Sequence, residues 1–410
     1  MPRAEPAVPE TSPPRFPFRF DGDRIAPELA EMAGHRPVRE VVTNTGTRAW
    51  LVAGYDEVRA VLRDRRFSLS LTSDPACPRQ DPLYPPLTAT DTLSYFQRGG
   101  MLSALHRGLG PTRRHLTEAE TAGHVRRVLR PFLDREEQPA DLVTGFVFPV
   151  SRALTFALLG LTEDGCPDDD VLFGIFRTGT GSDEVVPECW EKGRTYLSAQ
   201  LPRLRERRTG LLGELIALAD SRRTLSDDEL LDLFLFLFIS QYGNPATFLG
   251  AAFPTLMRHP QLVTRLRADP ELLPRAVEEL LRWTVFLGDG LPRIAREDVT
   301  VGDVRVRRGE LVLVSTDGAN HDPRVFPDPH RLDVDRPHNP HLRFSDGRHR
   351  CPGKSVASFQ AEVTLRVLLE ETEDIRLAVP CDAVDWRPFH AVTLPRSLPV
   401  RWRRRSAPPR

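Results

Sequence analysis

The segment Phe344-Ser345-Asp346-Gly347-Arg348-His349-Arg350-Cys351-Pro352-Gly353 joins an irregular stretch of the chain to a helix-like one. The residues that follow it place apolar side chains at helical spacing: Val356, Ala357, Phe359, Val363, Leu365, Leu368 and Leu369. Proline is favoured at the first position of a helix, so the pattern predicts a helix over about 352–371. Cys351 therefore stands at the cap of that helix.

A cysteine at the start of a helix has unusual chemistry. The free N–H groups and the partial positive charge of a helix N-terminus stabilise a thiolate over a thiol. A thiolate held in this way suits a soft metal or iron. Two alternatives remain on these residues alone: a buried structural cysteine, or a zinc site with His349 and Cys351 as two ligands. No second Cys/His pair stands at zinc-like spacing, which argues against zinc.

The pattern Phe-x-x-Gly-x-His-x-Cys-x-Gly resembles the haem-binding signature of the cytochrome P450 family, and every defined position is filled. The resemblance implies haem b as cofactor, with Cys351 as the proximal ligand of its iron. Phe344 would pack beside the thiolate, and Gly347 would permit a tight turn. His349 would donate to a haem propionate, and Gly353 would let the backbone approach the porphyrin and the sulfur.

A second motif of the same family lies upstream. Glu279-Leu280-Leu281-Arg282 is similar to the family's Glu-x-x-Arg, in which an i, i+3 ion pair on one helix face locks the region beneath the haem. Residues 319–323 and 326–329 resemble the family's meander, where Arg331 is expected to complete the ion-pair cluster. We therefore expect Glu279 and Arg282 to be structural rather than catalytic.

Two further haem contacts are expected from the resemblance. Residues 291–295 are similar to the strand whose arginine binds a propionate, and Arg293 is that arginine here. A guanidinium suits a carboxylate through paired, charge-assisted hydrogen bonds. Family members of this type also carry His-x-x-x-Arg on an earlier helix. His124 fits the histidine, but Val128 stands where the arginine belongs, so that arginine is left unassigned.

The bulk composition excludes some functions. The 410 residues carry a formal net charge of -1, so no global charge favours nucleic acid or an anionic membrane. The most apolar run, residues 230–239, is too short to cross a bilayer. Five cysteines without pair spacing, in a chain with no signal-peptide pattern, indicate reduced thiols and a cytoplasmic protein. We expect a monomer.

The pattern along the chain predicts a mainly α fold: one large P450-like domain at 16–403 with a small β-rich part, between a flexible proline-rich lead-in at 1–15 and a basic tail at 404–410. Ser226 and Glu229 form a capping box that opens an almost wholly apolar helix. Other predicted features are a hairpin at 38–52, helices at 55–63 and 271–283, strands within 299–314, a largely irregular lid or binding loop at 68–120, and a meander at 317–350.

The apolar helix departs from the family pattern where oxygen would bind. Counting back from 258–260, which resembles the end of the family's central helix, puts Gly243 at the usual acid position and Asn244 at the usual alcohol position. Neither side chain can act as a proton acid. Pro245 predicts a kink and frees a carbonyl. Proton delivery would then fall to ordered water bridging Gln241, Asn244 or a substrate hydroxyl.

The resemblance places the substrate between the 68–120 segment, the central helix and the strand after the Glu-x-x-Arg helix. An apolar, aromatic pocket is usual for such a site. The expected lining residues are Phe238, Thr247, Phe286, Leu287, Leu291 and Leu102, with Leu105 and Pro292 beside them.

Three hypotheses follow. The first is a haem-thiolate oxidoreductase that uses dioxygen and a ferredoxin-type electron donor. It would act on a small, largely apolar molecule of specialised metabolism by monooxygenation or oxidative coupling. The second keeps the haem but transfers a nitrene or oxygen from a substrate with its own leaving group. The third is a haem-free module for protein contacts, against which intact Cys351, His349 and Arg293 argue. Basic residues expected to steer an acidic donor are Arg126, Arg127, Arg130, Arg343, Arg348, Arg350 and Lys354.

Overall fold

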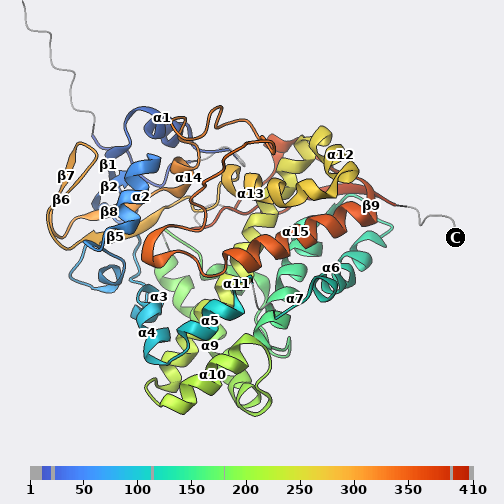
Figure 1. The fold of residues 1–410 in the computed structure, drawn as a ribbon, viewed down its shortest axis with the longest axis horizontal. Helices are drawn as coiled ribbons and strands as arrows, with labels where there is room; N and C mark the ends of the chain where they lie inside the picture. The colour runs from blue at the N-terminus through green and yellow to red at the C-terminus, as the bar shows by residue number, and fades with distance from the viewer. Residues whose placement is uncertain (1–11, 20–23, 112–114, 180, 388–390, 406–410) are drawn as a thin grey trace, which may run out of the picture.

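The computed structural model describes residues 12–19, 24–111, 115–179, 181–387 and 391–405. Helices dominate the described chain, as predicted (Figure 1). They are α1 (Pro27–His35), α2 (Tyr55–Arg63), α3 (Leu87–Thr90), α4 (Thr92–Arg98), α5 (Leu102–Gly108), α6 (Glu118–Leu133), α7 (Phe148–Leu159), α8 (Asp169–Gly174), α9 (Ser182–Arg207), α10 (Gly210–Arg222), α11 (Asp227–Arg258), α12 (Pro260–Ala268), α13 (Leu273–Trp283), α14 (Thr316–Ala319) and α15 (Lys354–Glu371).

The strands are β1 (Val38–Val42), β2 (Arg48–Val52), β3 (Phe67–Ser68), β4 (Ala140–Asp141), β5 (Leu291–Ala295), β6 (Val299–Val301), β7 (Val304–Val306), β8 (Leu311–Val314), β9 (Thr372–Leu377) and β10 (Pro399–Arg404). The largest sheet has the order β1-β2-β8-β5-β3. β2 pairs with β8 in parallel, and β5 pairs with β8 antiparallel so that Arg293 lies opposite Val312. This sheet, at the left in Figure 1, fixes the strand that carries Arg293.

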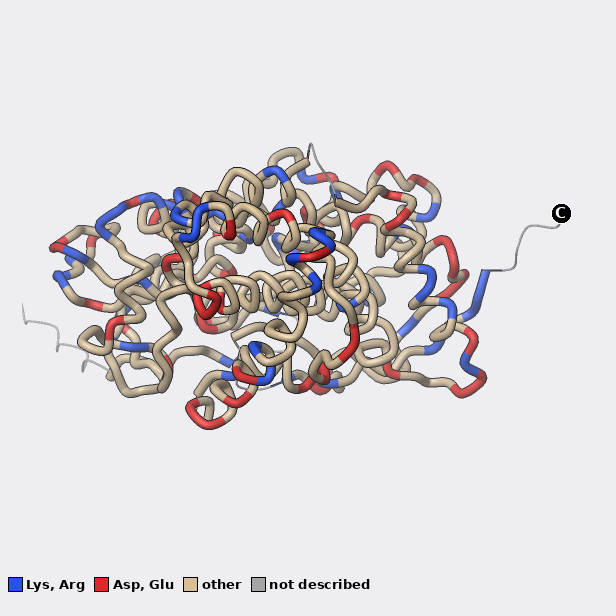
Figure 2. Tube along the Cα trace, turned by 90° about the horizontal axis from the view of Figure 1, so that it is seen from below, with Lys and Arg blue, Asp and Glu red and all other residues tan. Residues whose placement is uncertain are grey.

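Helix α11 forms the axis of the molecule. Its predicted capping box is present: Ser226 accepts from the Glu229 N–H, and Glu229 accepts from the Ser226 N–H. Beyond that cap the helix is buried over most of its length because its residues are apolar on nearly every face. It packs against α7 and α15, and α6 packs against the same two helices, so these four helices make the central bundle. Figure 2 shows Lys and Arg interspersed with Asp and Glu along the outer turns and helices of the molecule.

The segment 68–120 is more ordered than predicted. It contains β3, a 3₁₀ turn at Ser70–Ser73, and helices α3, α4 and α5, although the expectation was a largely irregular loop. These helices are four to seven residues long, and periodicity cannot detect elements of one or two turns. Order also begins before residue 16, because the Val42 N–H donates to the Pro14 carbonyl, while Arg404 closes β10 rather than opening a tail.

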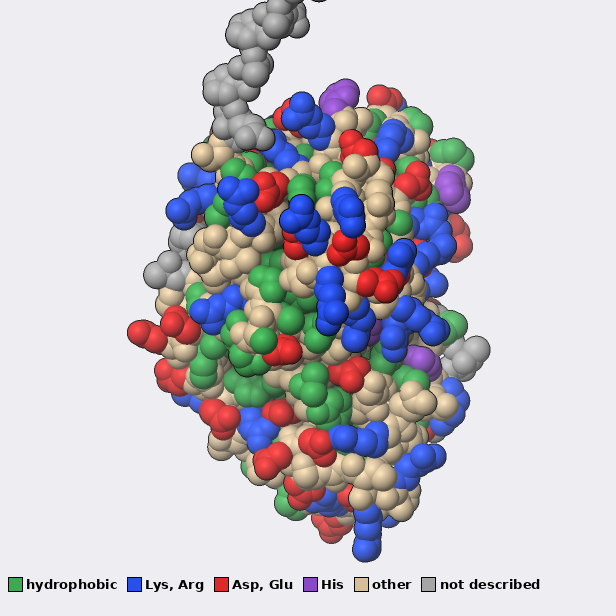
Figure 3. Space-filling model, turned by 90° about the vertical axis from the view of Figure 1, so that its left-hand side faces the viewer, with side chains coloured by type: hydrophobic (Ala, Val, Ile, Leu, Met, Phe, Trp, Pro, Cys, Tyr) green, Lys and Arg blue, Asp and Glu red, His purple; other side chains and the backbone are tan. Residues whose placement is uncertain are grey.

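The surface is electrically mixed. Figure 3 views the end that carries the β-rich part and shows both signs of charge interspersed with hydrophobic side chains. No helix among the described residues combines the length and apolar character needed to span a membrane.

Candidate active site

The turn before α15 is built around Gly347. Its φ of +70° suits glycine, and a Cβ there would come within 2.6 Å of the Leu62 carbonyl oxygen. Asp346 accepts from the Gly347 N–H and pairs with Arg59 and Arg63 of α2, at 3.1 and 2.9 Å. The predicted tight turn is present, and α2 anchors it.

The turn delivers Cys351 to the start of α15. Its N–H donates to the Phe344 carbonyl at 2.9 Å, so the two ends of the signature are joined. Burial raises the pKa of the Cys351 thiol, while the N–H groups of Gly353 and Lys354 lower it by donating to the sulfur. The side chain is nevertheless accessible to solvent. We interpret the combination of accessible surface and desolvation as that of a side chain at the floor of a hollow, which is where a prosthetic group would lie.

An unpaired cation lies near His349, in the turn that leads to Cys351. Arg293 is 3% exposed, and no carboxylate among the described residues pairs with it; its one hydrogen bond goes to the neighbouring Pro292 carbonyl at 2.7 Å. Burial lowers the pKa of Arg293 to about 10. Burial and the charge of Arg293 together lower the pKa of His349 to about 4, so these two residues are close to each other. A buried guanidinium without a counter-ion calls for an anion, and a haem propionate fits that place.

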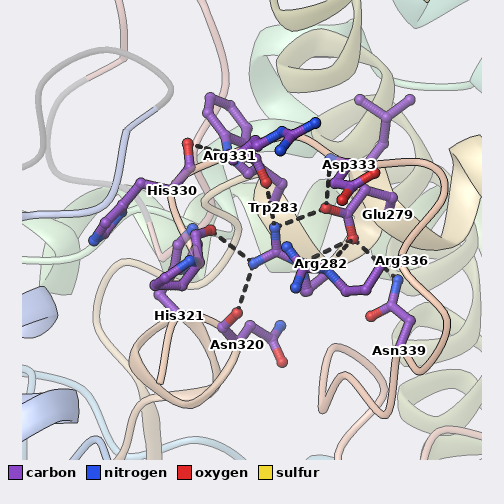
Figure 4. Close-up of polar contacts among 12 residues, drawn as sticks. Glu279, Arg282, Trp283, Asn320, His321, His330, Arg331, Asp333, Arg336 and Asn339 are labelled. Atoms are coloured by element: carbon purple, nitrogen blue, oxygen red, sulfur yellow. Dashed lines mark hydrogen bonds and ion pairs between the residues drawn. The ribbon is translucent and has the colours of Figure 1, made fainter. Parts of the chain in front are cut away.

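The Glu279–Arg282 pair is fully buried and lies at the centre of a network (Figure 4). Two guanidinium nitrogens of Arg282 meet the two carboxylate oxygens of Glu279 at 2.8 and 2.9 Å. The rest of the guanidinium donates to the carbonyls of Asn320, Pro329 and Arg331. The structural role predicted for the pair therefore has a clear geometric basis.

The expected third member of this cluster was wrong. Arg331 contributes only its carbonyl oxygen, at 3.2 Å from Arg282. The guanidinium that approaches Glu279 is that of Arg336, at 3.5 Å, from a side chain that is 7% exposed. Sequence spacing could not separate two arginines five residues apart in an irregular segment.

His124 lies away from the hollow. It is on α6, where the neighbouring Arg126 pairs with Glu370 at 2.7 Å and with Glu371 at 3.2 Å. Those carboxylates are about 24 Å along α15 from its first residue, at 1.5 Å per residue. The expectation that His124 contacts a propionate was therefore wrong, because α6 packs on the end of α15 remote from Cys351.

The predicted basic surface is smaller than expected. Arg343 is buried and pairs with Asp317 at 2.5 Å, so it is unavailable to a partner. The three arginines of α6 lie with His124, remote from Cys351. Only Arg348, Arg350 and Lys354 remain beside the Cys351 turn, and Lys354 pairs with Glu278 at 2.9 Å.

The central helix has no room for a side chain at position 243, where the acidic residue of the family pattern would be. Gly243 is buried, and a Cβ on it would overlap the ring of Phe176. The Gln241 carbonyl, which Pro245 cannot serve, accepts from the Thr155 hydroxyl at 2.9 Å. A Cβ on Gly353 would lie 3.4 Å from Gln241 Nε2 and 3.6 Å from Cys351 Sγ. The Gln241 side chain therefore lies near Gly353 and Cys351, and its role at the reacting centre stays a prediction.

The partly exposed residues of α11 are further candidates for the lining of the substrate site. Residues 236, 240, 241, 244 and 245 keep some exposure within an otherwise buried stretch. The spacing i, i+4, i+8 puts Phe236, Ser240 and Asn244 on one face, which we interpret as the wall of the hollow. Sequence reasoning missed Phe236 and Ser240, although that spacing from Asn244 would have found them.

Two predicted lining residues belong to the core instead. Phe238 is 0% exposed and packs against Phe156, Tyr196 and Tyr242, and Thr247 is also 0% exposed. A residue with no accessible surface cannot line an open pocket, so these two expectations were wrong.

The other lining candidates keep some surface. Phe286, Leu287, Leu291 and Leu102 are all partly accessible. The Phe286 carbonyl accepts from the Thr393 N–H at 3.0 Å, which brings the C-terminal segment to the same place.

No group of three or more His, Cys, Asp or Glu side chains within the described residues could hold a metal ion, so the structure gives the zinc alternative no support. Cys351 with its two N–H donors, and Arg293 beside His349, instead fit a haem and its propionates.

Comparison with known proteins agrees with this geometry. The family model described as Cytochrome P450 matches residues 182–373. Mycocyclosin synthase of Mycobacterium tuberculosis is 36% identical over 405 residues, covering 94% of this chain and 98% of the relative. Mycinamicin IV hydroxylase/epoxidase of Micromonospora griseorubida is 34% identical over 404 residues, covering 95% and 99%. The crystal structure of P450mel 107F1, with biaryl coupling reactivity, superposes with a TM-score of 0.83 at 29% identity, covering 95% and 99%.

Proposed function

Because this chain belongs to the cytochrome P450 family, we propose that it oxidises a small, largely apolar molecule of specialised metabolism, by monooxygenation or oxidative coupling. A haem held by a thiolate supplies oxidising chemistry, since the thiolate pushes electron density toward iron and favours O–O cleavage. The relatives named above favour these reactions over nitrene or oxygen transfer from a substrate leaving group. The observation that carries the proposal is a desolvated thiol that accepts from two N–H groups at the start of α15, in a turn whose His349 lies near a buried guanidinium without a counter-ion.

Within this proposal the cofactor is haem b. The five cysteines include no Cys-x-x-Cys pair of the kind that attaches a haem covalently. Cys351 would hold the iron, and Arg293 and His349 would hold the propionates. Gly353 leaves room above the sulfur.

The substrate would bind between the accessible face of α11 and the segment before β5. Phe236 and Phe286 would supply aromatic surface, while Ser240, Gln241 and Asn244 offer hydroxyl and amide groups beside the reacting centre. These groups can bind and orient a substrate or a water, and none of them is an acid. A ferredoxin-type donor would dock where Arg348 and Arg350 are exposed, close to the Cys351 turn.

The first experiment tests the thiolate. The reduced carbon monoxide complex of the purified protein should show the red-shifted band typical of a thiolate haem, and Cys351→Ser should abolish it. Serine variants of Cys77, Cys166, Cys189 and Cys381 are matched controls and should keep the band. A Cys351→Ser protein with the unchanged band would remove the basis of the proposal.

A further inference from the structure

A cavity of about 620 Å³ lies outside the region of Cys351. Its walls come from α6 with Arg135 just beyond its end, Gly145, α7, the segment 161–163 and the first residue of α8. Neither Cys351, Arg293 nor His349 lines it. The volume is sufficient for a molecule of small-ligand size, within the usual range for ligand sites.

The lining of this cavity contains more arginines than acidic residues. Arg152 is committed, because it pairs with Asp169 and donates to the Pro167 carbonyl at 3.2 Å. Arg127 contacts His124 Nδ1 at 3.3 Å, and Arg135 lies 5.3 Å above the Phe132 ring. Neither Arg127 nor Arg135 forms an ion pair with a carboxylate of the described residues.

The cavity lining contains fewer carboxylates than guanidinium groups. Besides Asp169, the lining contains one acidic residue, Glu163, and it is exposed. Burial and the charge of Arg127 lower the pKa of His124, which is therefore neutral at neutral pH. The cavity thus presents a net positive rim, which favours an anion.

The remaining walls are apolar. Phe132, Phe156 and Leu161 are buried and contribute to the lining, together with prolines and alanines of α6 and α7. An occupant that used both features would combine an apolar body with one carboxylate. Arginine binds carboxylates through two parallel hydrogen bonds, so two free arginines can specify the charged end.

The cavity is connected to the central helix by one chain of contacts. The hydroxyl of Tyr242 donates to Asp169 at 2.6 Å, and the Arg152 guanidinium that pairs with Asp169 lies 6.0 Å from the Tyr242 ring. Tyr242 is fully buried and directly precedes Gly243 and Asn244. A ligand carboxylate that drew Arg152 away from Asp169 would leave that carboxylate and the Tyr242 hydroxyl to reorganise.

We propose that this cavity is a second ligand site, which binds a small apolar carboxylate at Arg127 and Arg135 and couples its presence to the central helix through Arg152, Asp169 and Tyr242. Such coupling is reciprocal: whatever the carboxylate does to affinity at the haem, a ligand of the haem does to the carboxylate. The binding part does not depend on the haem, whereas the coupling part rests on the proposed function.

The binding test uses 4-phenylbutyrate as the anion and 4-phenylbutanol as its neutral counterpart, with affinity measured by calorimetry. Phenylbutyrate should bind at least tenfold more tightly than the alcohol. The double variant Arg127→Met, Arg135→Met should remove that preference. Arg130→Met is the matched control, since Arg130 of α6 is exposed, as Arg127 and Arg135 are, but does not line the cavity. Equal affinity for acid and alcohol, or an undiminished preference in the double variant, would overturn the site.

The coupling test measures how tightly imidazole binds the haem iron, by its spectral shift, with and without saturating phenylbutyrate. The midpoint should move severalfold in the native protein. In Tyr242→Phe it should stay fixed while phenylbutyrate still binds, because the ring is kept and only the hydroxyl link to Asp169 is lost. A midpoint that moves equally in Tyr242→Phe, or that never moves, would refute the coupling. A protein that binds phenylbutyrate but gives no thiolate haem spectrum would fail the proposed function and leave this site standing.

Discussion

Replacing Arg293 with methionine should affect the haem-free and the haem-loaded protein in opposite directions. In the haem-free chain the guanidinium is buried without a counter-ion, and burial lowers its pKa from the ordinary arginine value to about 10. At about 1.4 kcal/mol per pKa unit, the charged form costs the fold about 3 kcal/mol. Methionine fills much of the same volume without a charge. Haem-free Arg293→Met should therefore unfold at higher urea concentration than the native chain, by up to that free energy.

The loaded protein should lose affinity for haem instead. A hydrogen bond between charged groups contributes about 1.5–3 kcal/mol, so losing the arginine should weaken haem binding about 10- to 100-fold. Haem transfer to a scavenging protein measures that ratio, and circular dichroism in urea measures the stability of the haem-free chain.

Arg343→Met is the matched control, because Arg343 is also buried but is paired with Asp317 and donates to the Leu281 carbonyl. Its removal should destabilise the chain with or without haem, by about 3–5 kcal/mol, since it leaves a buried carboxylate uncompensated. Two results would contradict this: haem-free Arg293→Met as destabilised as Arg343→Met, or native haem affinity in Arg293→Met. Either result would show that Arg293 is not an unpaired cation that binds an anionic group of the haem.

Three further outcomes are expected. Gly243→Ala should destabilise the chain by about 1–3 kcal/mol in urea unfolding because its methyl overlaps Phe176, and adding Phe176→Ala should recover much of the loss; a neutral Gly243→Ala would contradict this packing. Burial and the charge of Arg282 lower the pKa of His321 to about 3, so the unfolded chain takes up a proton between about pH 6.5 and 3 that the folded chain refuses. Stability should fall as pH falls through that range, and His321→Gln should flatten the decline; an unchanged slope would show that His321 does not cause it. Glu279→Gln should cost about 3–5 kcal/mol and lower the yield of folded protein, since it leaves the Arg282 cation buried without its partner; native stability would show that the backbone carbonyls alone hold Arg282.

The features that sequence predicted well are those with a local physical signature. The Ser226 capping box and the apolar helix behind it each depend on a few adjacent residues. The helix after Cys351 was also predicted, but it begins at Lys354 with Gly353 as its N-cap, two residues later than the predicted start at Pro352, so Cys351 is not the cap residue. Such features follow from capping and steric rules that need no knowledge of the rest of the chain. The Glu279–Arg282 pair and the turn at Gly347 were expected from the family resemblance instead, and the structure contains both.

The failures concern packing between distant elements. The sequence prediction placed His124 at the haem because His124 matches one motif position. The ion pairs of Arg126 with Glu370 and Glu371, hundreds of residues apart in sequence, decide instead which face of α6 packs against α15. Arg336 replaced Arg331 in the buried cluster because the meander has no period from which to count. Phe238 was taken for a pocket wall, since an apolar residue on an all-apolar helix carries no sign of which side faces the hollow.

The central helix combines a feature that the sequence predicts with packing that only the structure shows. Sequence alone established that Gly243 and Asn244 cannot transfer protons as an acid and an alcohol would. The structure adds that Phe176 fills the space beside Gly243 and that Thr155 occupies the carbonyl freed by Pro245. A carboxylate at 243 would therefore meet an aromatic ring rather than water. The departure from the family pattern is thus accommodated by neighbouring residues, because the space that a side chain at position 243 would need is already filled and the freed carbonyl already has a donor.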